Sequence, residues 1–276
     1  MARSWASLQQ AKQQGRKIVA LTAYDAPTAK LVQAAGLDLI IVGDSVGTNV
    51  LGYGSEQEVT LADILHHLRA VRRGSPDLPV IADLPYGTYS SVSAALDNAQ
   101  ALMAAGADAV KLEGPEIDTV KALVQAGIPV CGHLGLLPQT QQERRLQGKT
   151  LTEAQAIWQG SLALQGAGVV VLVLELIPWE LAGWISRQLA IPTIGIGSGW
   201  QTDGQVLVVQ DVLGMSERQL RLAKAYAQVG EQMLQAFRLY AQEVRQGHFP
   251  APEHARPMPP ATLAAFQAWL AETGGG

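Results

Sequence analysis

Ionisable side chains stand at the ends of successive apolar runs in this sequence. The set comprises Asp44, Asp83, Lys111, Glu113, His133 and Glu175. Where such runs form neighbouring strands, these groups converge, and burying their charges is costly unless each is paired or binds a metal. Carboxylates that share one site repel each other without a cation, and oxygen ligands with room for water suit Mg²⁺. The pattern therefore predicts a site that holds Mg²⁺.

Less specific interpretations of the same residues stay open at this point. Each acid alone could cap a neighbouring helix or form an ion pair with Lys111. One lysine cannot neutralise four carboxylates, so the set as a whole favours a metal site. His133 in "CGHLG" could be a core histidine, but its place at the end of a run favours a role in the site. Cys131, inside the same run, is typical of a small buried hydrophobe.

Eight short apolar runs carry these residues. They begin at Lys17, Leu37, Pro79, Asp108, Ile128, Val169, Pro192 and Gln205. Their apolar residues are too continuous for a sheet with one wetted face, so they indicate buried parallel strands. Amphipathic stretches lie between most of them; one begins at a Thr cap, Thr60, and stops at Gly74.

This alternation predicts an α/β fold, a (β/α)8 TIM barrel with added N- and C-terminal helices. A doubly wound open sheet is the competing fold. Eight strands suit a closed barrel, and no GxGxxG follows the first run. One unit is irregular, because "GWQTDG" between the last two runs is too short for a helix. In such a barrel the active site lies at the C-terminal ends of the strands, where the ionisable groups stand.

We expect one domain over residues 1–276, with the barrel at about 17–215 and a helical extension at about 216–276. Residues 1–16 suit a helix across the bottom of the barrel. A long amphipathic stretch begins at Ser216, and a proline-rich link and a last short helix follow it.

Charge and composition narrow the class of protein. The 276 residues carry a net charge of −4 without a long basic or acidic run, which gives no footprint for nucleic acid or an anionic membrane. The single cysteine permits no disulfide within the chain. The N-terminus has no apolar core of a secretory signal, and no run approaches the length of a membrane helix. We therefore expect a cytoplasmic protein.

Several fragments resemble the ketopantoate hydroxymethyltransferase family. They are "LTAYDAPTAKL", "GDSVGTNVLGY", "ADLPYGTY", "AVKLEG", "CGHLGLLPQ", "IPTIGIGSGWQTDGQVLVVQDVLG" and "EVRQGHFP". Their order and spacing match the family from about Lys17 to about Pro252. The resemblance implies a barrel of the phosphoenolpyruvate/pyruvate superfamily. It also implies Mg²⁺-dependent hydroxymethyl transfer from 5,10-methylenetetrahydrofolate to 3-methyl-2-oxobutanoate, which gives 2-dehydropantoate for pantothenate synthesis through a Mg²⁺-stabilised enolate.

The resemblance also implies roles for single residues. The metal ligands would be Asp44, Asp83 and Glu113. The contacts to the oxo acid would be Asp44, Ser45, Asp83 and Lys111, and the proton acceptor would be Glu175. The glycine-rich remainder of "VGDSVGTNVLGYGS" is a candidate mobile flap over the site. Members of the family often form decamers, so the resemblance implies a homo-oligomer, possibly a homodecamer. The stretch "TQQERRLQGKT", from Thr140, departs from the family's usual pattern.

Three rival interpretations remain at this stage. Another Mg²⁺-dependent lyase or mutase of the same superfamily, such as the isocitrate lyase type, would use Cys131, although this chain shares only the end of that group's "KKCGH" motif. An aldolase would form a Schiff base on Lys111. A barrel reused as a scaffold would have no reason to keep several costly acids at its strand ends.

Overall fold

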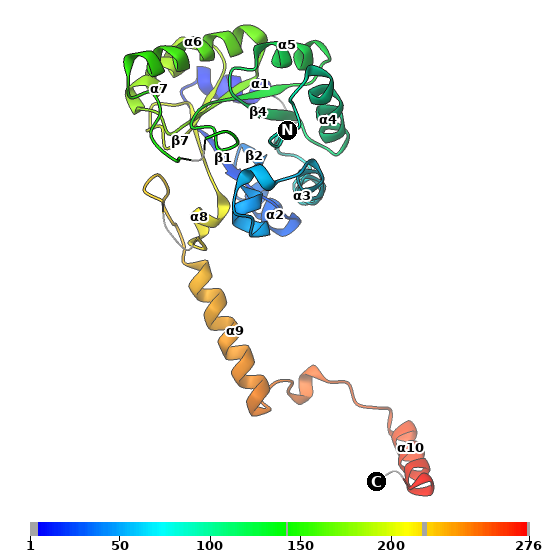
Figure 1. The fold of residues 1–276 in the computed structure, drawn as a ribbon. Coiled ribbons are helices and arrows are strands. Elements are labelled where there is room, and N and C mark those ends of the chain that lie inside the picture. The colour runs from blue at the N-terminus through cyan, green and yellow to red at the C-terminus, as the bar shows by residue number, and fades with distance from the viewer. Residues whose placement is uncertain (1–4, 142, 217–219, 275–276) are drawn as a thin grey trace. The chain divides into compact units, whose positions relative to one another are not determined.

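The computed structural model describes residues 5–141, 143–216 and 220–274, and it contains the predicted barrel (Figure 1). Eight parallel strands pair in chain order, and β8 pairs with β1 to close the barrel. The strands are β1 (Ile18–Thr22), β2 (Leu39–Val42), β3 (Val80–Asp83), β4 (Ala109–Glu113), β5 (Val130–Gly135), β6 (Val171–Glu175), β7 (Thr193–Ile196) and β8 (Gly204–Leu207). Each strand overlaps one of the eight apolar runs, so the (β/α)8 prediction is confirmed.

Helices surround the barrel on its outer side (Figure 1). They are α1 (Trp5–Gln13), α2 (Ala26–Ala34), α3 (Leu61–Gly74), α4 (Val92–Ala104), α5 (Ile117–Gln125), α6 (Leu151–Ala167), α7 (Trp179–Gln188) and α8 (Val209–Leu213). The side chain of Thr60 accepts a hydrogen bond from the backbone of Asp63 in a capping box, which starts α3 at the predicted place. α2 has no counterpart among the predicted stretches, although Asp25 caps it and a proline lies in its first turn.

Alternate strand residues fill the barrel interior with small and branched side chains. Ile18 of β1 and Ile81 of β3 are buried there together with Leu8 and Ala11 of α1. α1 therefore closes the N-terminal end of the barrel, as predicted for residues 1–16, of which 1–4 lie outside the described residues. A second, larger cluster packs the outer faces of the strands against the helices. Among the described residues, no helix is long and apolar enough to cross a membrane.

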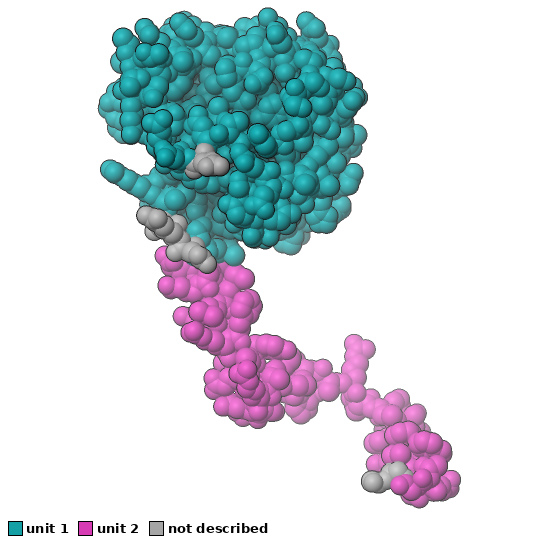
Figure 2. All heavy atoms as spheres, viewed as in Figure 1, with its two compact units in different colours: residues 1–227 teal, residues 228–276 magenta. Residues whose placement is uncertain are grey.

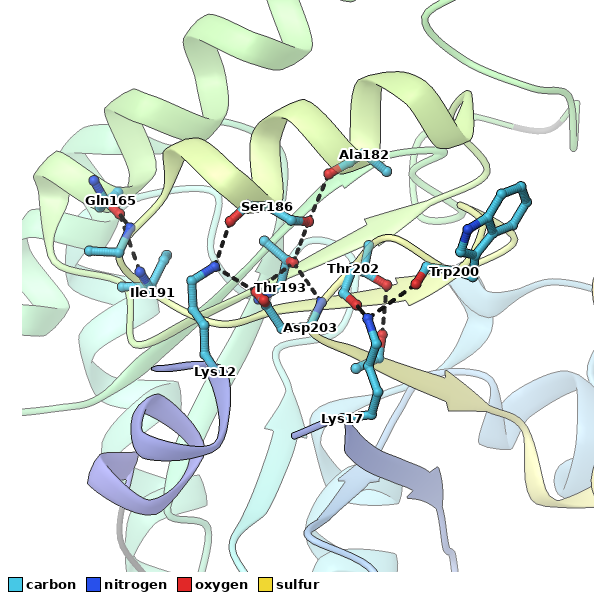
Figure 3. Close-up of polar contacts among 12 residues, drawn as sticks. Lys12, Lys17, Gln165, Ala182, Ser186, Ile191, Thr193, Trp200, Thr202 and Asp203 are labelled. Atoms are coloured by element: carbon cyan, nitrogen blue, oxygen red, sulfur yellow. Dashed lines mark hydrogen bonds and ion pairs between the residues drawn. The ribbon is translucent and has the colours of Figure 1, made fainter. Parts of the chain in front are cut away.

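A polar network holds the N-terminal ends of β7 and β8 together (Figure 3). The carboxylate of Asp203 accepts hydrogen bonds from the backbone N–H and the hydroxyl of Thr193, at 2.8 and 2.9 Å. Lys12 of α1 donates to the same oxygen of Asp203 at 2.7 Å and to the carbonyl of Ser186 at 2.6 Å. The described segment 197–203 between β7 and β8 contains no helix, as its length predicted, so these contacts hold the two strands at their N-terminal ends.

The predicted amphipathic helix from Ser216 is wrong in its starting point, because the helix begins only at Val229. Residues 220–228 are not helical, and 217–219 lie outside the described residues. The backbone N–H of Tyr226 donates to the carbonyl of Val212 at 2.8 Å, which ties this segment back to the end of α8. Leu220 and Leu222 line the cavity of the barrel. These contacts are made instead of helical hydrogen bonds, and the helix begins only after them, at Val229.

The described chain divides into two compact units, residues 1–227 and residues 228–276 (Figure 2). The second unit contains α9 (Val229–Gln246), a 3-10 turn (Pro252–His254) and α10 (Pro260–Thr273). α9 and α10 bury none of their described side chains in this structure. The proline-rich link and the last short helix are therefore found where they were predicted.

Candidate active site

The barrel brings all seven predicted site residues to one cavity of about 1200 Å³. They are Asp44, Ser45, Asp83, Lys111, Glu113, His133 and Glu175. Five of them belong to strands β3 to β6, whose alternation points every second side chain into the barrel. Register places Asp83 beside Lys111 and Glu113 beside His133 on neighbouring strands. Strand geometry alone therefore assembles most of the site.

A lysine lies among the carboxylates at the centre of the site. The ammonium group of Lys111 is 2.8 Å from the carboxylate of Asp83, and both side chains are buried. Burial alone would lower the pKa of Lys111, but Asp83, Asp44 and Glu113 raise it above its ordinary value. Lys111 therefore stays protonated and provides a fixed positive charge.

Burial and a neighbouring negative charge disfavour the ionised form of Asp44. Burial, followed by the charge of Asp83, raises the pKa of Asp44 to about 8, although Lys111 opposes this. The backbone N–H of Asp44 donates to Oδ2 of Asp83 at 3.0 Å, so the two residues are directly linked. The pair has more negative charge than Lys111 alone can compensate.

Asp83 has a buried oxygen that suits a cation. Its Oδ2 contacts Lys111 and Asp44, whereas its Oδ1 has no hydrogen-bond partner among the described residues. In the described part of the chain no three His, Cys, Asp or Glu side chains enclose a cation by themselves. Mg²⁺ is usually bound through one or two carboxylates and keeps several waters or substrate oxygens. Asp44 and Asp83 fit such an open site.

Glu113 is held by other partners as well. Its Oε2 accepts a hydrogen bond from the backbone of Gln139 at 3.0 Å, and its Oε1 lies 3.4 Å from Nδ1 of His133. Burial would raise the pKa of Glu113, but the contact with His133 and the charge of Lys111 lower it, so Glu113 is ionised. It adds negative charge beside the other two acids.

His133 lies between two glutamates. Its Nε2 is 3.2 Å from Oε2 of Glu175, and its Nδ1 faces Glu113, although neither nitrogen makes a well-aligned hydrogen bond. Burial would lower the pKa of His133, but the carboxylates of Glu113 and Glu175 raise it to about 9. The side chain of Glu175 is 17% exposed, compared with 2% for Glu113. The carboxylate of Glu175 is therefore more accessible from the cavity than that of Glu113.

The backbone next to Glu175 is in an unusual conformation. Leu176 has a φ of 48°, and it is the only non-glycine residue with positive φ among the described residues. The carbonyl of Glu175 accepts a hydrogen bond from Leu136 at 2.9 Å, directly beside Gly135, whose φ is 103°. A Cβ atom at Gly135 would lie 2.0 Å from that carbonyl oxygen. Only glycine permits this close approach, which fixes where Glu175 leaves its strand.

The candidate flap after Asp44 has a defined structure. Residues Gly47–Leu51 form one π-helical turn, and Ser55 and Glu58 form a capping box on the next turn. Ser45 is held at the start of the segment, where its hydroxyl lies 2.8 Å from the hydroxyl of Tyr24. Whether the flap moves stays a prediction.

The divergent stretch from Thr140 lies at the mouth of the cavity. Arg144 forms an ion pair with Glu56 of the flap segment, and both residues line the cavity. Residue 142 lies outside the described residues. The stretch therefore contributes to the rim of the site, while the buried acids come from other segments.

Three polar residues of the site were missed in the sequence. Gln139 is completely buried and contacts both Asp44 and Glu113, while Tyr24 and Tyr89 approach Ser45 and Gln139. Uncharged side chains in loops carry no periodic signal. The available clues were the position of Gln139 just beyond the end of a strand and the place of all three residues in the fragments that resemble the family.

The geometry counts against two rivals. Cys131 is buried in the barrel interior, and burial raises its pKa to about 12, which suits neither a nucleophile nor an acid catalyst. Lys111 stays protonated, whereas a Schiff-base lysine attacks as the neutral amine.

Comparisons with known proteins identify the family of the chain. The family model of ketopantoate hydroxymethyltransferase matches residues 3–252. The chain is 48% identical over 248 residues to a 3-methyl-2-oxobutanoate hydroxymethyltransferase from Thermus thermophilus, which covers 87% of this chain and 95% of that protein. It is also 48% identical over 264 residues to the protein of that name from Chloroflexus aurantiacus, with 94% of each chain covered.

Solved structures show the same fold at low identity. A phosphonopyruvate hydrolase in complex with oxalate and Mg²⁺ matches with a TM-score of 0.63 and 14% identity, covering 99% of this chain and 98% of that one. A 2,3-dimethylmalate lyase of the PEP mutase/isocitrate lyase superfamily matches with a TM-score of 0.59 and 18% identity over all of both chains. These structures share the barrel fold of this chain. On the family model and these close relatives, the chain belongs to the ketopantoate hydroxymethyltransferase family.

Proposed function

We propose that this cavity performs the family's reaction by removing a proton from the carbon next to a ketone. The chain transfers a hydroxymethyl group to 3-methyl-2-oxobutanoate in pantothenate biosynthesis, as 48% identity over most of its length supports. The co-substrate is 5,10-methylenetetrahydrofolate and the product is 2-dehydropantoate. The observation that carries the mechanism is the buried group of Asp44, Asp83 and Lys111 facing Glu175 across one cavity.

Asp44 and Asp83 would hold Mg²⁺, with Glu113 as the third acid of the metal site. The raised pKa of Asp44 and the unpartnered Oδ1 of Asp83 support this assignment, because a divalent cation relieves both. When bound, Mg²⁺ supplies Lewis-acid polarisation of the keto oxygen. Two carboxylates would leave room for water and for oxygens of the substrate.

Ser45 and Lys111 bind and orient the oxo acid. The hydroxyl of Ser45 can donate to the substrate's carboxylate, and the protonated Lys111 stabilises negative charge that develops on the keto oxygen. Asp44 and Asp83 share this surface of the cavity, so substrate and metal contacts overlap. Because Lys111 is already ordered by Asp83, it needs little rearrangement during the reaction.

Glu175 accepts the proton from the α-carbon. The C–H bond breaks, and its electron pair forms the enolate of the oxo acid. The bond from the folate's methylene carbon to N10 breaks as the ring opens, and the enolate carbon forms the new carbon–carbon bond with that methylene carbon. Water then supplies the hydroxyl oxygen as the remaining bond to N5 breaks, and tetrahydrofolate leaves with the proton taken from the substrate and one proton of the water on its two nitrogens. His133 holds the carboxylate of Glu175 in place through the 3.2 Å contact.

The size of the cavity supports two substrates. Pockets for single small ligands are usually about 300–1,000 Å³. The cavity of about 1200 Å³ therefore leaves room for the folate above the small oxo acid.

Assembly and location are part of the same proposal: the chain forms a homo-oligomer, possibly a homodecamer, in the cytoplasm, with residues 1–276 as one domain. The exposed apolar side chains of α9, among them Phe237 and Tyr240, support a partner surface. Sedimentation equilibrium of the full chain tests the assembly, and a monomer at micromolar concentration would contradict it.

A glutamate-to-glutamine change tests the proposed mechanism. Glu175→Gln keeps the size of the side chain and removes the base, so we expect Mg²⁺ and substrate binding close to wild type. Exchange of the α-proton of 3-methyl-2-oxobutanoate for deuterium, followed by NMR, should fall at least about a hundredfold. Glu180→Gln, at an exposed position of α7, is the matched control and should exchange normally. Unchanged exchange in Glu175→Gln would refute the role of Glu175.

A further inference from the structure

Gln139 is the most connected uncharged side chain of the site. It follows β5 in a turn closed by hydrogen bonds from Thr140 and Gln141 to the carbonyl of Leu137, and it is completely buried. Its backbone N–H donates to Oε2 of Glu113 at 3.0 Å, and its side-chain Nε2 donates to Oδ2 of Asp44 at 2.7 Å. One residue therefore binds two of the acids that the proposed function assigns to the metal.

The orientation of this amide follows from the chemistry of its neighbours. Nε2 faces the carboxyl group of Asp44 and the backbone carbonyl of Leu84, at 2.7 and 3.1 Å, and the carbonyl can only accept a hydrogen bond. Oε1 accepts from the hydroxyl of Tyr89 at 2.5 Å. Burial raises the pKa of Tyr89, so this hydroxyl keeps its proton as a donor. A flipped amide would turn its oxygen towards the carbonyl of Leu84, which cannot donate, and would lose that hydrogen bond.

Further contacts connect Gln139 to segments far apart in the chain. The backbone carbonyl of Gln139 accepts from the side chain of Gln57 at 2.7 Å, in the turn that follows the flap. Tyr89 comes from the loop after β3, and Glu113 ends β4. The spacing between Asp44 and Glu113 is therefore set through one buried residue rather than through each strand end alone.

We propose that Gln139 is a positioning residue that holds Asp44 and Glu113 in the arrangement that binds Mg²⁺. This rests on the proposed function. It adds a second layer to the site, because the ligands come from strand ends while their spacing comes from the loop after β5. Residues in such a layer usually change metal affinity by about 10- to 100-fold when they are replaced.

The test is a calorimetric titration of Mg²⁺ into the metal-free full chain, without substrate. Gln139→Met keeps the length of the side chain and removes its hydrogen bonds, so we expect Mg²⁺ to bind about 10- to 100-fold more weakly. Gln141→Met is the matched control, because its side-chain oxygen has no hydrogen-bond partner among the described residues. It should bind Mg²⁺ within about twofold of wild type, well short of the loss of about 10- to 100-fold expected for Gln139→Met.

A second variant keeps the test decisive if Gln139→Met fails to fold. Tyr89→Phe removes the hydroxyl that donates to the amide oxygen of Gln139, and we expect an intermediate loss of Mg²⁺ affinity, about three- to tenfold. A merely structural role would leave Mg²⁺ binding unchanged in every folded variant, and excess Mg²⁺ would not restore α-proton exchange. Equal affinity in wild type and the folded variants would overturn the positioning role alone. A wild-type protein that binds no Mg²⁺ would overturn the proposed metal site as well.

Discussion

Replacing Gly135 by alanine should displace the proposed base, Glu175, without changing its side chain. The new Cβ would lie 2.0 Å from the carbonyl oxygen of Glu175, whereas real contacts of this kind are essentially never under 3.0 Å. The carbonyl must therefore move by about 1 Å, or β5 must move away by the same amount. A displacement of that size in a catalytic group can slow a reaction about a hundredfold.

A second glycine separates this displacement from simple backbone strain. Gly127, after α5, has a φ of 78°, but a Cβ there would meet nothing within 4 Å. Gly127→Ala and Gly135→Ala both place alanine in the left-handed region, at a cost of about 1–2 kcal/mol. Only Gly135→Ala also meets the backbone of Glu175.

The assay is α-deuterium exchange of 3-methyl-2-oxobutanoate at saturating Mg²⁺, with urea unfolding to check that each variant is folded. We expect Gly135→Ala to exchange about a hundredfold more slowly than wild type, with Gly127→Ala close to wild type. Exchange by folded Gly135→Ala within about threefold of wild type would refute the reasoning, because that hundredfold loss would then be missing.

Three further predictions concern stability. Lys111→Met leaves the buried carboxylate of Asp83 without its cation, so the free energy of unfolding in urea at pH 8 without Mg²⁺ should fall by about 3–5 kcal/mol. A fall of less than about 1 kcal/mol would contradict the ion pair. The pKa of His133 rises from 6.5 to about 9 on folding, so its protonated form stabilises the protein without Mg²⁺ fully below about pH 6.5. This contribution, about 3 kcal/mol, is lost as the pH rises towards 9. His133→Gln should flatten the dependence of the unfolding free energy on pH, and an unchanged dependence would count against the charged state of His133. Asp203→Asn weakens the network at the opposite end of the barrel and should cost about 1–2 kcal/mol in urea unfolding while exchange per folded molecule stays unchanged; slower exchange would show that the two ends are coupled.

The barrel and its buried acids could be predicted because they follow from periodic signals. Continuous apolar runs mark buried parallel strands, and an ionisable residue at the end of such a run must lie at the mouth of the barrel. Asp83, Lys111 and Glu113 were found in this way, and the resemblance supplied the particular role of Glu175.

The missed features depend on contacts between distant segments. Gln139 binds Asp44 across 95 positions of sequence, and Tyr24 reaches Ser45 from the loop after β1. No local pattern encodes such a pairing. The start of α9 was predicted wrongly for a related reason. Residues 220–228 have an amphipathic pattern, but their contacts with the barrel override helix formation.

The central claim is that the site can remove the α-proton without the folate. The most direct measurement is deuterium exchange of 3-methyl-2-oxobutanoate by the wild-type chain in D₂O without folate, with Mg²⁺ and then with a chelator. We predict exchange with Mg²⁺ and its loss with the chelator. Exchange that needs folate, or that continues unchanged in the chelator, would contradict the account.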